Sequence, residues 1–426
     1  MFLLTSAVLP PPPPPPPPPC AAGTTTSTAT GSPTATPAGQ RTYLPLTPAR
    51  LMDTRSGAST VDGISSGGGA VAPCTTRTLK VTGRGGVPSS GVGSVVLNLT
   101  STSSTTGGFL TVFPTGAARP EASNLNFAAG QTIANAVVAK VGSNGQVSIF
   151  NFQGSTHVIV DVAGWFPTIS DYNALSPARL MDTRPGGATV DGSASGTGAL
   201  GSGATRSLTV TGRGGVPASG VGAVVLNLTA TGPTSVSFLT AFPAGTARPP
   251  TSNLNVGPGQ TIANLVVAKV GSNGQIWIYN SAGSTHVIAD VAGWFPTGSD
   301  YNALTPARLM DTRPGAATVD GLLAGLGALA PGSTRSLTVT GRAGVPTSGV
   351  GAVVLNVTVT GPTAAGFLTV FPSGVARPNA SNVNFGPLQT IANSVVAKVG
   401  SNGSVSIYNA TGSTQVIVDI AGWLPA

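Results

Sequence analysis

Short apolar segments rich in Val, Leu, Ile and Thr recur along this chain, and Gly, Pro, Asn and Ser separate them about every 8–15 residues. No window places apolar residues at the i, i+3, i+4 and i+7 spacing of an amphipathic helix between plausible caps. The pattern predicts an all-β protein. In the first third of the chain the predicted strands are 50–54, 76–82, 94–102, 108–113, 124–127, 132–141, 146–150 and 156–162.

These strands favour a two-sheet sandwich with Greek-key or jelly-roll-like connections, and a partly closed barrel is the alternative. Asn144-Gly145 lies between two apolar runs and predicts a type I′ hairpin, because both turn residues need a positive φ. A second hairpin is predicted to join 146–150 to 156–162 across Gly154-Ser155.

The whole pattern occurs three times with a period of 129 residues and without insertion or deletion, so that Asp53, Asp182 and Asp311 are equivalent. The period exceeds the roughly 20–50 residues of one solenoid coil or propeller blade and matches the size of a whole domain. We therefore expect three tandem β-sandwich domains in a row, each about as long as the period: 43–171, 172–300 and 301–426.

Residues 1–42 differ from the repeats in composition. Residues 1–9 are apolar, like the remnant of a secretory signal, and are followed by ten prolines at 10–19 that predict a stiff polyproline II rod. Residues 21–40 are rich in Thr, Ser, Ala, Pro and Gly, which is typical of a disordered linker. The chain has no run of 18 apolar residues, so no transmembrane segment is predicted.

Charge is sparse and evenly spread. Only 8% of residues are charged, and the net charge of +8 is not gathered into the Lys/Arg clusters that follow a nucleic-acid backbone. Nucleic acid is therefore not an expected partner. The two cysteines, Cys20 and Cys74, have no equivalents in the later copies. Neither a disulfide framework nor a metal site is expected from them, and no cofactor motif is present.

Comparison of the copies argues against catalysis. His157 and His286 are replaced by Gln415 in the third copy, which an essential imidazole would not tolerate. Asp53 and Asp161 are repeated in every copy and could form the carboxylate pair of an enzyme site together with Arg55. Because Arg50 and Arg55 flank Asp53, we interpret these residues as structural Arg–Asp pairs, and no catalytic residue is predicted.

Tryptophan gives the one candidate ligand-binding residue. Trp165, Trp294 and Trp423 close the three copies at equivalent positions and are expected to pack at the edge of a core. Trp277 instead replaces a serine of the other copies on the polar side of its strand. An exposed Trp at this position could stack on a sugar or contact a partner.

Four phrases resemble a β-rich repeat of secreted and cell-wall-associated bacterial proteins of actinobacterial type, in which such repeats stand in tandem or beside wall hydrolases. They are Arg-Leu-Met-Asp-Thr-Arg (50–55), Gly-Val-Gly-Ala-Val-Val-Leu-Asn-Leu-Thr (220–229), Ser-Asn-Leu-Asn (252–255) and Val-Ile-Val-Asp-Val-Ala-Gly-Trp-Phe (158–166). The resemblance covers the chain from Tyr43 onward. It implies a secreted or cell-surface accessory module and no particular activity.

Together these observations lead us to expect a non-catalytic extracellular or cell-surface repeat protein with a structural or adhesive role. The alternative is a multivalent array of carbohydrate-binding modules for cell-wall polysaccharide, in which Trp277 contacts the ligand and weak sites add up. Cell-wall glycans or other surface proteins are the expected partners. An enzyme built on Asp53, Asp161 and Arg55 is the third hypothesis. The sequence does not define an oligomeric state.

Overall fold

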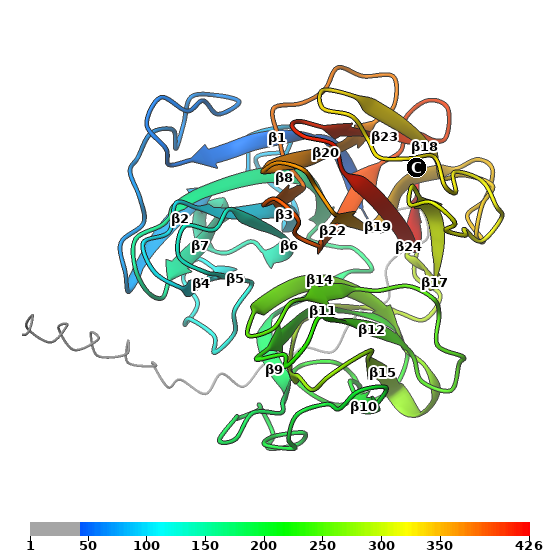
Figure 1. The fold of residues 1–426 in the computed structure, drawn as a ribbon. Helices are drawn as coiled ribbons and strands as arrows, with labels where there is room; N and C mark the ends of the chain where they lie inside the picture. The colour runs from blue at the N-terminus through cyan, green and yellow to red at the C-terminus, as the bar shows by residue number, and fades with distance from the viewer. Residues whose placement is uncertain (1–42) are drawn as a thin grey trace, which may run out of the picture.

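The computed structural model describes residues 43–426 and is all-β, as the sequence predicts (Figure 1). The signal-like segment, the polyproline rod and the linker predicted in residues 1–42 lie outside the described residues. The first repeat contributes eight strands: β1 (Leu44–Asp53), β2 (Thr75–Lys80), β3 (Val92–Thr102), β4 (Gly108–Pro114), β5 (Leu125–Phe127), β6 (Ile133–Lys140), β7 (Gln146–Asn151) and β8 (His157–Pro167).

The later repeats contain the same eight strands each. The second has β9 (Asn173–Asp182), β10 (Thr205–Thr209), β11 (Val221–Thr231), β12 (Ser237–Pro243), β13 (Leu254–Val256), β14 (Thr261–Lys269), β15 (Gln275–Asn280) and β16 (His286–Pro296). The third has β17 (Asn302–Asp311), β18 (Thr334–Thr338), β19 (Val350–Thr360), β20 (Gly366–Pro372), β21 (Val383–Phe385), β22 (Ile391–Lys398), β23 (Ser404–Asn409) and β24 (Gln415–Pro425). Single 3₁₀ turns, η1 (Ser143–Gly145) and η2 (Ser272–Gly274), follow β6 and β14.

All eight strands predicted in the first repeat are present. The main differences are that the first strand begins earlier, at Leu44, and that the last extends to Pro167. The extension of β8 carries the Ala-Gly-Trp-Phe phrase into the sheet, where Gly164 pairs with Val96 of β3. No helix among the described residues is long and apolar enough to cross a membrane.

Each repeat forms two antiparallel four-stranded sheets. In the first repeat the orders are β1-β8-β3-β6, which we call the inner sheet, and β2-β7-β4-β5, the outer sheet. The inner and outer sheets of the other repeats are formed by the equivalent strands. In the second repeat, buried side chains of both sheets, among them Leu226 and Ile278, belong to one continuous hydrophobic core.

Both hairpin predictions are wrong in their pairing. Asn144 and Gly145 do have the positive φ angles expected of them, 58° and 67°. However, β6 before this turn belongs to the inner sheet, and β7 after it belongs to the outer sheet. The segment around Gly154-Ser155 likewise leads from the outer to the inner sheet. Both turns therefore connect the two sheets at the edge of the core. The apolar side chains of β7 face those of the inner sheet, so β7 packs against that sheet and does not extend it.

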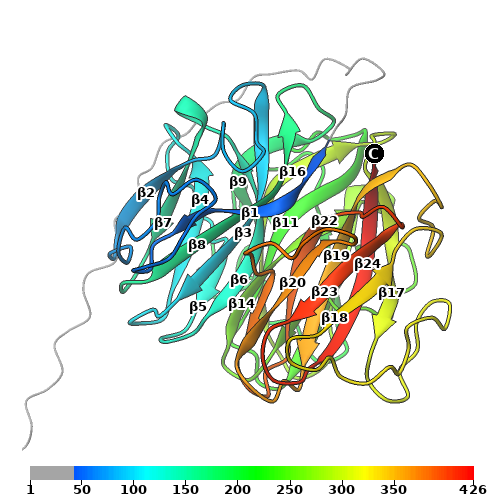
Figure 2. The same cartoon turned by 90° about the horizontal axis from the view of Figure 1, so that it is seen from above.

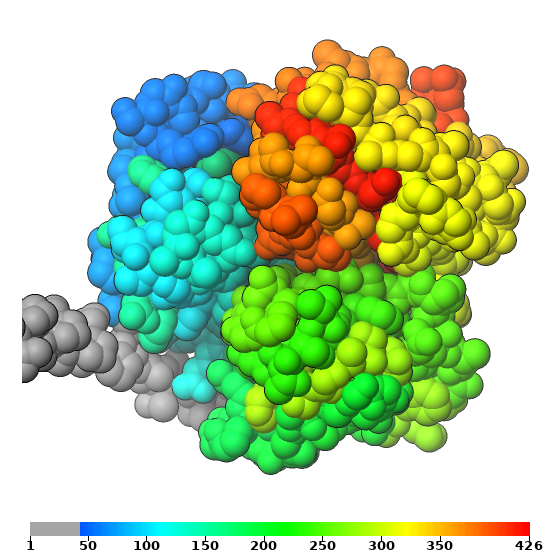
Figure 3. All heavy atoms as spheres, in the orientation of Figure 1, coloured from blue at the N-terminus to red at the C-terminus, as the bar shows by residue number. Residues whose placement is uncertain are grey.

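The six sheets form a ring, and the prediction of three separate sandwich domains in a row is wrong (Figures 1 and 2). The strands β6, β14 and β22, one from each repeat, all contact one another at the centre of this ring. Each repeat also places its short outer strand on the next repeat: β5 contacts β14, β13 contacts β22, and β21 contacts β6. The third repeat thereby closes back on the first, and the space-filling view shows the three repeats packed side by side (Figure 3).

The inner sheets are buried on both faces, which explains the ring. In β3, Val95, Leu97 and Leu99 point into the core of the first repeat. Val96 points the opposite way, into a separate cluster at the centre of the ring to which all three repeats contribute. The predicted boundaries 43–171, 172–300 and 301–426 enclose the three sets of strands but remain a prediction as domain limits, because the repeats share this central core.

Candidate functional site: the contacts between repeats

Arg50 holds together the two carboxylates that the sequence suggested as a candidate pair. Its Nε and Nη2 atoms donate hydrogen bonds to both oxygens of Asp161, at 2.8 and 3.3 Å, and Nη1 donates to Asp53 at 3.2 Å. Arg55 adds a two-pronged contact to Asp53 at 2.9 and 2.6 Å. The register of β1 against β8 places Arg50 opposite Asp161, so strand pairing alone brings these charges together.

The surroundings of the two acids differ. Burial raises the pKa of Asp161, and the hydrogen bonds and charge of Arg50 oppose that rise. Burial would also raise the pKa of Asp53, but hydrogen bonds from the side chain and backbone of Arg55 outweigh it and lower the pKa. The predicted structural pairing of Arg with Asp is therefore confirmed. The same set recurs as Arg179, Arg184, Asp182 and Asp290 in the second repeat, and as Arg308, Arg313, Asp311 and Asp419 in the third.

A second Arg–Asp pair fixes the long loop between β1 and β2. Arg84, buried in the loop Gly83–Pro88, donates to both oxygens of Asp62 at 2.7 and 2.8 Å and to the backbone oxygen of Leu51 at 2.7 Å. These hydrogen bonds are the largest contribution lowering the pKa of Asp62 to about 2. The Gly-rich segment is thus a structural loop around a buried arginine.

The histidines serve as polar strand residues. Nδ1 of His157 lies 3.1 Å from Oγ1 of Thr54, which accepts the backbone N–H of Val158 and so has its proton free to donate to the ring. In the third repeat Thr312 donates in the same way to Oε1 of Gln415. Since an amide oxygen and an unprotonated ring nitrogen accept equally well, the exchange of His for Gln is explained. No group of three or more His, Cys, Asp or Glu in residues 43–426 could hold a metal ion.

Buried asparagines join the repeats, and sequence reasoning missed them. Nδ2 of Asn135 donates to Oδ1 of Asn227 in the next repeat at 2.8 Å, and Oδ1 of Asn135 accepts the backbone N–H of Leu265 at 3.0 Å. Asn227 in turn donates to the backbone oxygen of Ser123 in the first repeat. The equivalents Asn264 with Asn356 and Asn393 with Asn98 repeat this arrangement at the other two interfaces. The sequence signal that could have revealed them is the single Asn within each of the two otherwise largely apolar strands, β3 and β6, and within their equivalents.

The charged set also takes part in these interfaces. The backbone N–H of Ser381, in the third repeat, donates to Oδ2 of Asp161 in the first at 3.3 Å. The backbone N–H groups of Ser123 and Ser252 act at the equivalent positions on Asp290 and Asp419, where they oppose the rise in pKa that burial causes. Each of these buried aspartates therefore ties β8, β16 or β24 both to an arginine of its own repeat and to the neighbouring repeat.

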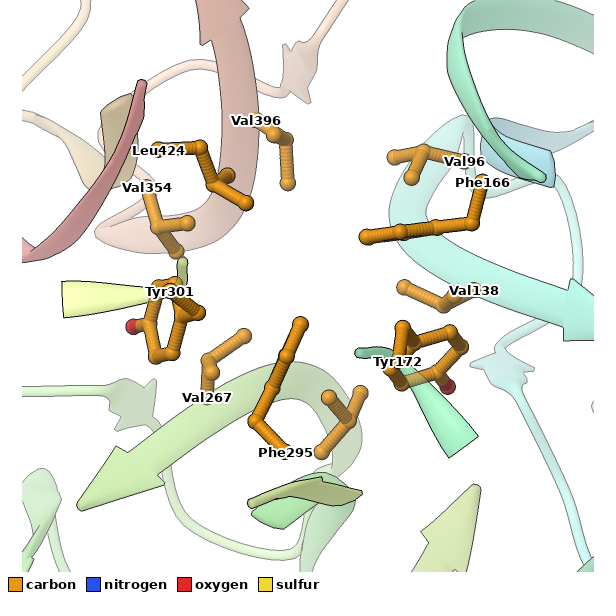
Figure 4. Close-up of a pocket in the computed structure, with 11 residues that line it drawn as sticks. Val96, Val138, Phe166, Tyr172, Val267, Phe295, Tyr301, Val354, Val396 and Leu424 are labelled. Carbon is orange, nitrogen blue, oxygen red and sulfur yellow. The ribbon is translucent and has the colours of Figure 1, made fainter. Parts of the chain in front are cut away.

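Aromatic side chains surround the centre of the ring (Figure 4). Phe166 lies between Tyr43 of its own repeat and Tyr172 of the next, with ring centroids 4.9 and 4.6 Å away. Phe295 lies 4.7 Å from Tyr301 and Leu424 occupies the third equivalent position. The space that these apolar side chains leave is about 10 Å³, room for no more than one water molecule. This centre is packing and holds no ligand site.

A larger cleft of about 280 Å³ lies at the interface between the first and second repeats. Phe109, Arg119 and Glu121 line it from the first repeat, and Arg184 and Thr229 from the second. Arg119 lies over the ring of Phe150 at 4.2 Å, which fixes the segment between β4 and β5 that forms one wall. The cleft is open to solvent and contains both charged and apolar groups.

Trp277 lies outside this cleft, on the outer sheet of the second repeat. It is partly buried and meets the ring of Phe242 edge-on, with centroids 5.8 Å apart and planes at 86°. The predicted exposure is therefore only partial, and its role in ligand binding stays a prediction. Trp165, Trp294 and Trp423 pack against the cores of the repeats, as expected of them.

Comparison with known proteins does not assign a family. No family model matches the chain, and no curated protein matches it. The solved structures that the chain matches include two described as "The Triple Jelly Roll Fold and Turret Assembly in an Archaeal Virus" and "Life in the extremes: atomic structure of Sulfolobus Turreted Icosahedral Virus". Each is 10% identical with a TM-score of 0.19, over 83% of this chain and 85% and 86% of theirs. A likeness at this TM-score supports no functional argument.

Proposed function

We propose that this protein is a non-catalytic extracellular or cell-surface protein with a structural or adhesive role, in which the three repeats act as one rigid head. The observation that carries the proposal is the closed cycle of buried contacts between repeats. Asn135 binds the second repeat, Asn264 the third, and Asn393 the first again. A cycle of this kind resists independent movement of any one repeat, because each is held from both sides.

The state of the ionisable groups favours a structural role over catalysis. An acid–base enzyme needs a carboxyl group that can reach a substrate and exchange a proton with it. Here both oxygens of Asp161 accept hydrogen bonds from Arg50, and the group is buried against the neighbouring repeat. Asp53 is held between two arginines. Screening wild type against Asp161→Asn for hydrolase activity tests this part, and activity in the wild type that the variant lacks would contradict it.

We further infer that each repeat is a jelly-roll-like unit of the secreted, actinobacterial-type repeats that its sequence resembles. The orders β1-β8-β3-β6 and β2-β7-β4-β5 place consecutive strands mostly in alternate sheets, as two interleaved Greek keys do. The motif residues also make structural contacts in every copy. Arg50 and Asp53 form an ion pair, and Trp165 packs on the core. This supports a motif that specifies a fold.

Localisation is the experiment that decides the main proposal. Fractionation of the source cells, with an antibody against the repeats and protease treatment of intact cells, is expected to find the protein secreted or in the cell wall and accessible from outside. Cell-wall glycans and other surface proteins are the proposed partners, and nucleic acid is not among them. Recovery of the protein only from the cytoplasm would overturn the proposal.

A multivalent carbohydrate-binding role is the second candidate. The observation that favours it is the partly exposed Trp277 on the outer sheet, whose ring is perpendicular to that of Phe242. The test is binding of cell-wall polysaccharide by wild type and by Trp277→Ala. Equal binding by the two proteins would show that Trp277 does not contact the polysaccharide, although the protein could still bind it elsewhere.

A further inference from the structure

The cleft between the first and second repeats is built from two walls that only the assembled ring brings together. Phe109 and Arg119 come from the outer sheet of the first repeat and the segment after it, whereas Arg184, Thr229 and Thr261 come from the inner sheet of the second and its edge. Its volume of about 280 Å³ is close to the lower end of the ~300–1,000 Å³ range of ligand pockets. A ligand portion of one or two rings suits it better than a folded partner.

An independent feature of the same cleft is an unsatisfied hydroxyl. Thr229 lines the cleft, is 1% exposed, and its Oγ1 has no hydrogen-bond partner within residues 43–426. The same atom is unsatisfied in the equivalent residues Thr100 and Thr358. Burying a hydroxyl without a partner is unfavourable, and the three equivalent threonines therefore mark each interface as a place where a small polar group can approach the buried hydroxyl.

The charges at the cleft are balanced. Arg179 and Arg184 are already paired with Asp290 and Asp182, and Glu121, which lines the same wall as the remaining Arg119, also acts on Arg179. A phosphate or another anion would meet no net positive charge. Arg184 is half-exposed, and its Nη1 atom has no acceptor in the described part of the chain, so it can donate to a ligand without losing Asp182.

We propose that this cleft is a binding subsite for a neutral carbohydrate chain. A sugar ring offers hydroxyls that both donate and accept, which suits the mixture of Arg, Glu and Thr groups in the lining, and an apolar C–H face that packs on an aromatic ring. Phe109, which is partly exposed and stacked on Phe152 at 4.5 Å, provides that ring. The proposal rests on the adhesive form of the proposed function and assigns it a site other than Trp277.

The 129-residue period places the same residue types at the other two interfaces. Phe238 and Phe367 replace Phe109, Arg313 and Arg55 replace Arg184, and the threonines are unchanged. Two of the positions used here differ: Glu121 is Pro250 and Asn379 in the later copies, and Phe152 is Ser281 and Ala410. The charge balance and the stacked aromatic pair therefore belong to the first interface. Three subsites on one rigid body would strengthen weak binding through multivalency by a factor of about 10²–10⁴, provided that one glycan or one glycan surface spans them.

The test is binding of the full chain to an array of neutral and anionic oligosaccharides, followed by calorimetry with the best neutral tetrasaccharide. The test variant is Phe109→Ala/Phe238→Ala/Phe367→Ala, which removes the stacking ring at every interface. Arg184→Lys is the milder second variant, because lysine keeps the charge beside Asp182 and loses the free guanidinium donor. Trp277→Ala is the matched control, since it also removes an aromatic side chain, and circular dichroism with thermal melting checks the fold of each protein.

We expect the wild type to bind neutral glycans, the triple variant to lose at least tenfold in affinity, Arg184→Lys to lose affinity severalfold at the one subsite that it alters, and Trp277→Ala to bind as the wild type does. Loss in Trp277→Ala with retention in a folded triple variant would overturn the cleft proposal and leave a glycan-binding function standing. Binding of anionic glycans or of peptides only, or no binding at all, would also overturn it. The proposed structural role is tested separately, by the cell fractionation, so that failure of one proposal can be told from failure of the other.

Discussion

The Nδ2 amide of Asn135 in the first repeat donates a hydrogen bond of 2.8 Å to Oδ1 of Asn227 in the second. Both side chains are buried, and the remaining polar atoms of Asn135 bind Leu265 and Asn124. A buried amide with all its partners in place specifies one geometry, because any other packing leaves donors and acceptors unsatisfied. These amides therefore fix how the repeats face one another, while the apolar contacts around them provide most of the stabilisation.

Replacing Asn135 with Asp turns its donor atom into an acceptor that faces two oxygens. We expect Asn135→Asp to lower the free energy of unfolding by about 2–4 kcal/mol, since a buried polar group loses its partners and a charge is added. Urea unfolding measures this. The control is Asn126→Asp, whose amide donates to Oγ of Ser123 at 3.3 Å, three residues away in the same repeat, and we expect it to cost less than about 1 kcal/mol. Equal losses would contradict the special role of Asn135.

The closed ring also predicts the size of the molecule in solution. A compact body of the size of residues 43–426 has a radius of gyration of about 21 Å, whereas three repeats strung out in a row would be considerably larger. Small-angle X-ray scattering on this fragment measures the value directly. A much larger radius with the flat Kratky profile of linked independent modules would contradict the shared core.

The strands could be predicted from the sequence because local patterns determine them. β3 and β8 were recognised from runs of β-branched residues bounded by Gly and Pro, and Asn144-Gly145 was recognised as a turn with positive φ. The same local rules gave the wrong partner for β7. Whether a strand extends the sheet of the preceding strand or belongs to the opposite sheet depends on which distant strands cover its apolar face. The sequence of a three-residue turn does not contain this information.

The arrangement of the repeats was present in the sequence but was not recognised. Val95-Val96-Leu97 in β3 is apolar on both sides of the strand, which is the pattern of a strand buried on both faces. By contrast, β2 alternates between exposed and buried positions, as expected with one face in water. The cleft could not have been found in this way. Its walls, Phe109 and Thr229, belong to different repeats and meet only when the ring closes.

The aromatic centre of the ring contains its own natural comparison. The positions of Phe166 and Phe295 are equivalent to Leu424, so that leucine is tolerated at one site of three. We expect Phe295→Leu to cost about 1–3 kcal/mol, because the ring loses its contacts with Tyr301 at 4.7 Å and Tyr172 at 5.1 Å. Thermal melting measures the loss. Phe367→Leu on the partly exposed outer sheet is the control, and a similar loss there would show that the centre is not special.

Arg50 neutralises two buried carboxylates, so its removal should be costly. We expect Arg50→Leu to lower the free energy of unfolding by about 3–5 kcal/mol at pH 7. Burial already raises the pKa of Asp161, and without Arg50 the main group that opposes that rise is lost. A carboxyl group whose folded pKa is raised stabilises the fold at low pH and loses that contribution as the pH rises through the folded pKa. The variant should therefore be relatively more stable at pH 5 than at pH 8.

Urea unfolding at the two pH values measures this dependence. The control is the double variant Arg50→Leu/Asp161→Leu, which removes the uncompensated charge together with the arginine. We expect it to recover part of the loss and most of the pH dependence. A double variant that is as pH-sensitive as the single one would show that the carboxyl group responsible is not Asp161.

For the loops between the first two strands of each repeat we expect the opposite pH dependence, a loss of stability in acid. Asp62 and Asp191 have pKa values of about 2 because Arg84 and Arg213 donate hydrogen bonds to them, and Arg342 lowers the pKa of Asp320 in the same way. A carboxyl group whose folded pKa is depressed contributes stability above its unfolded pKa of about 4. That contribution is lost as the pH falls through the folded pKa.

The triple variant Asp62→Asn/Asp191→Asn/Asp320→Asn isolates this contribution, since asparagine keeps the shape and one acceptor but not the charge. At about 1.4 kcal/mol per pKa unit, reduced for the partial exposure of these side chains, each pair contributes about 1 kcal/mol. We expect the variant to be about 3 kcal/mol less stable than the wild type at pH 7 and nearly equal to it at pH 2. Because Asp161, Asp290 and Asp419 titrate alike in both proteins, the difference between the two unfolding curves, measured with urea from pH 7 to pH 2, reports these loops alone. A difference that stays constant across that range would show that the Arg–Asp pairs hold the loops by shape and hydrogen bonding and not by charge.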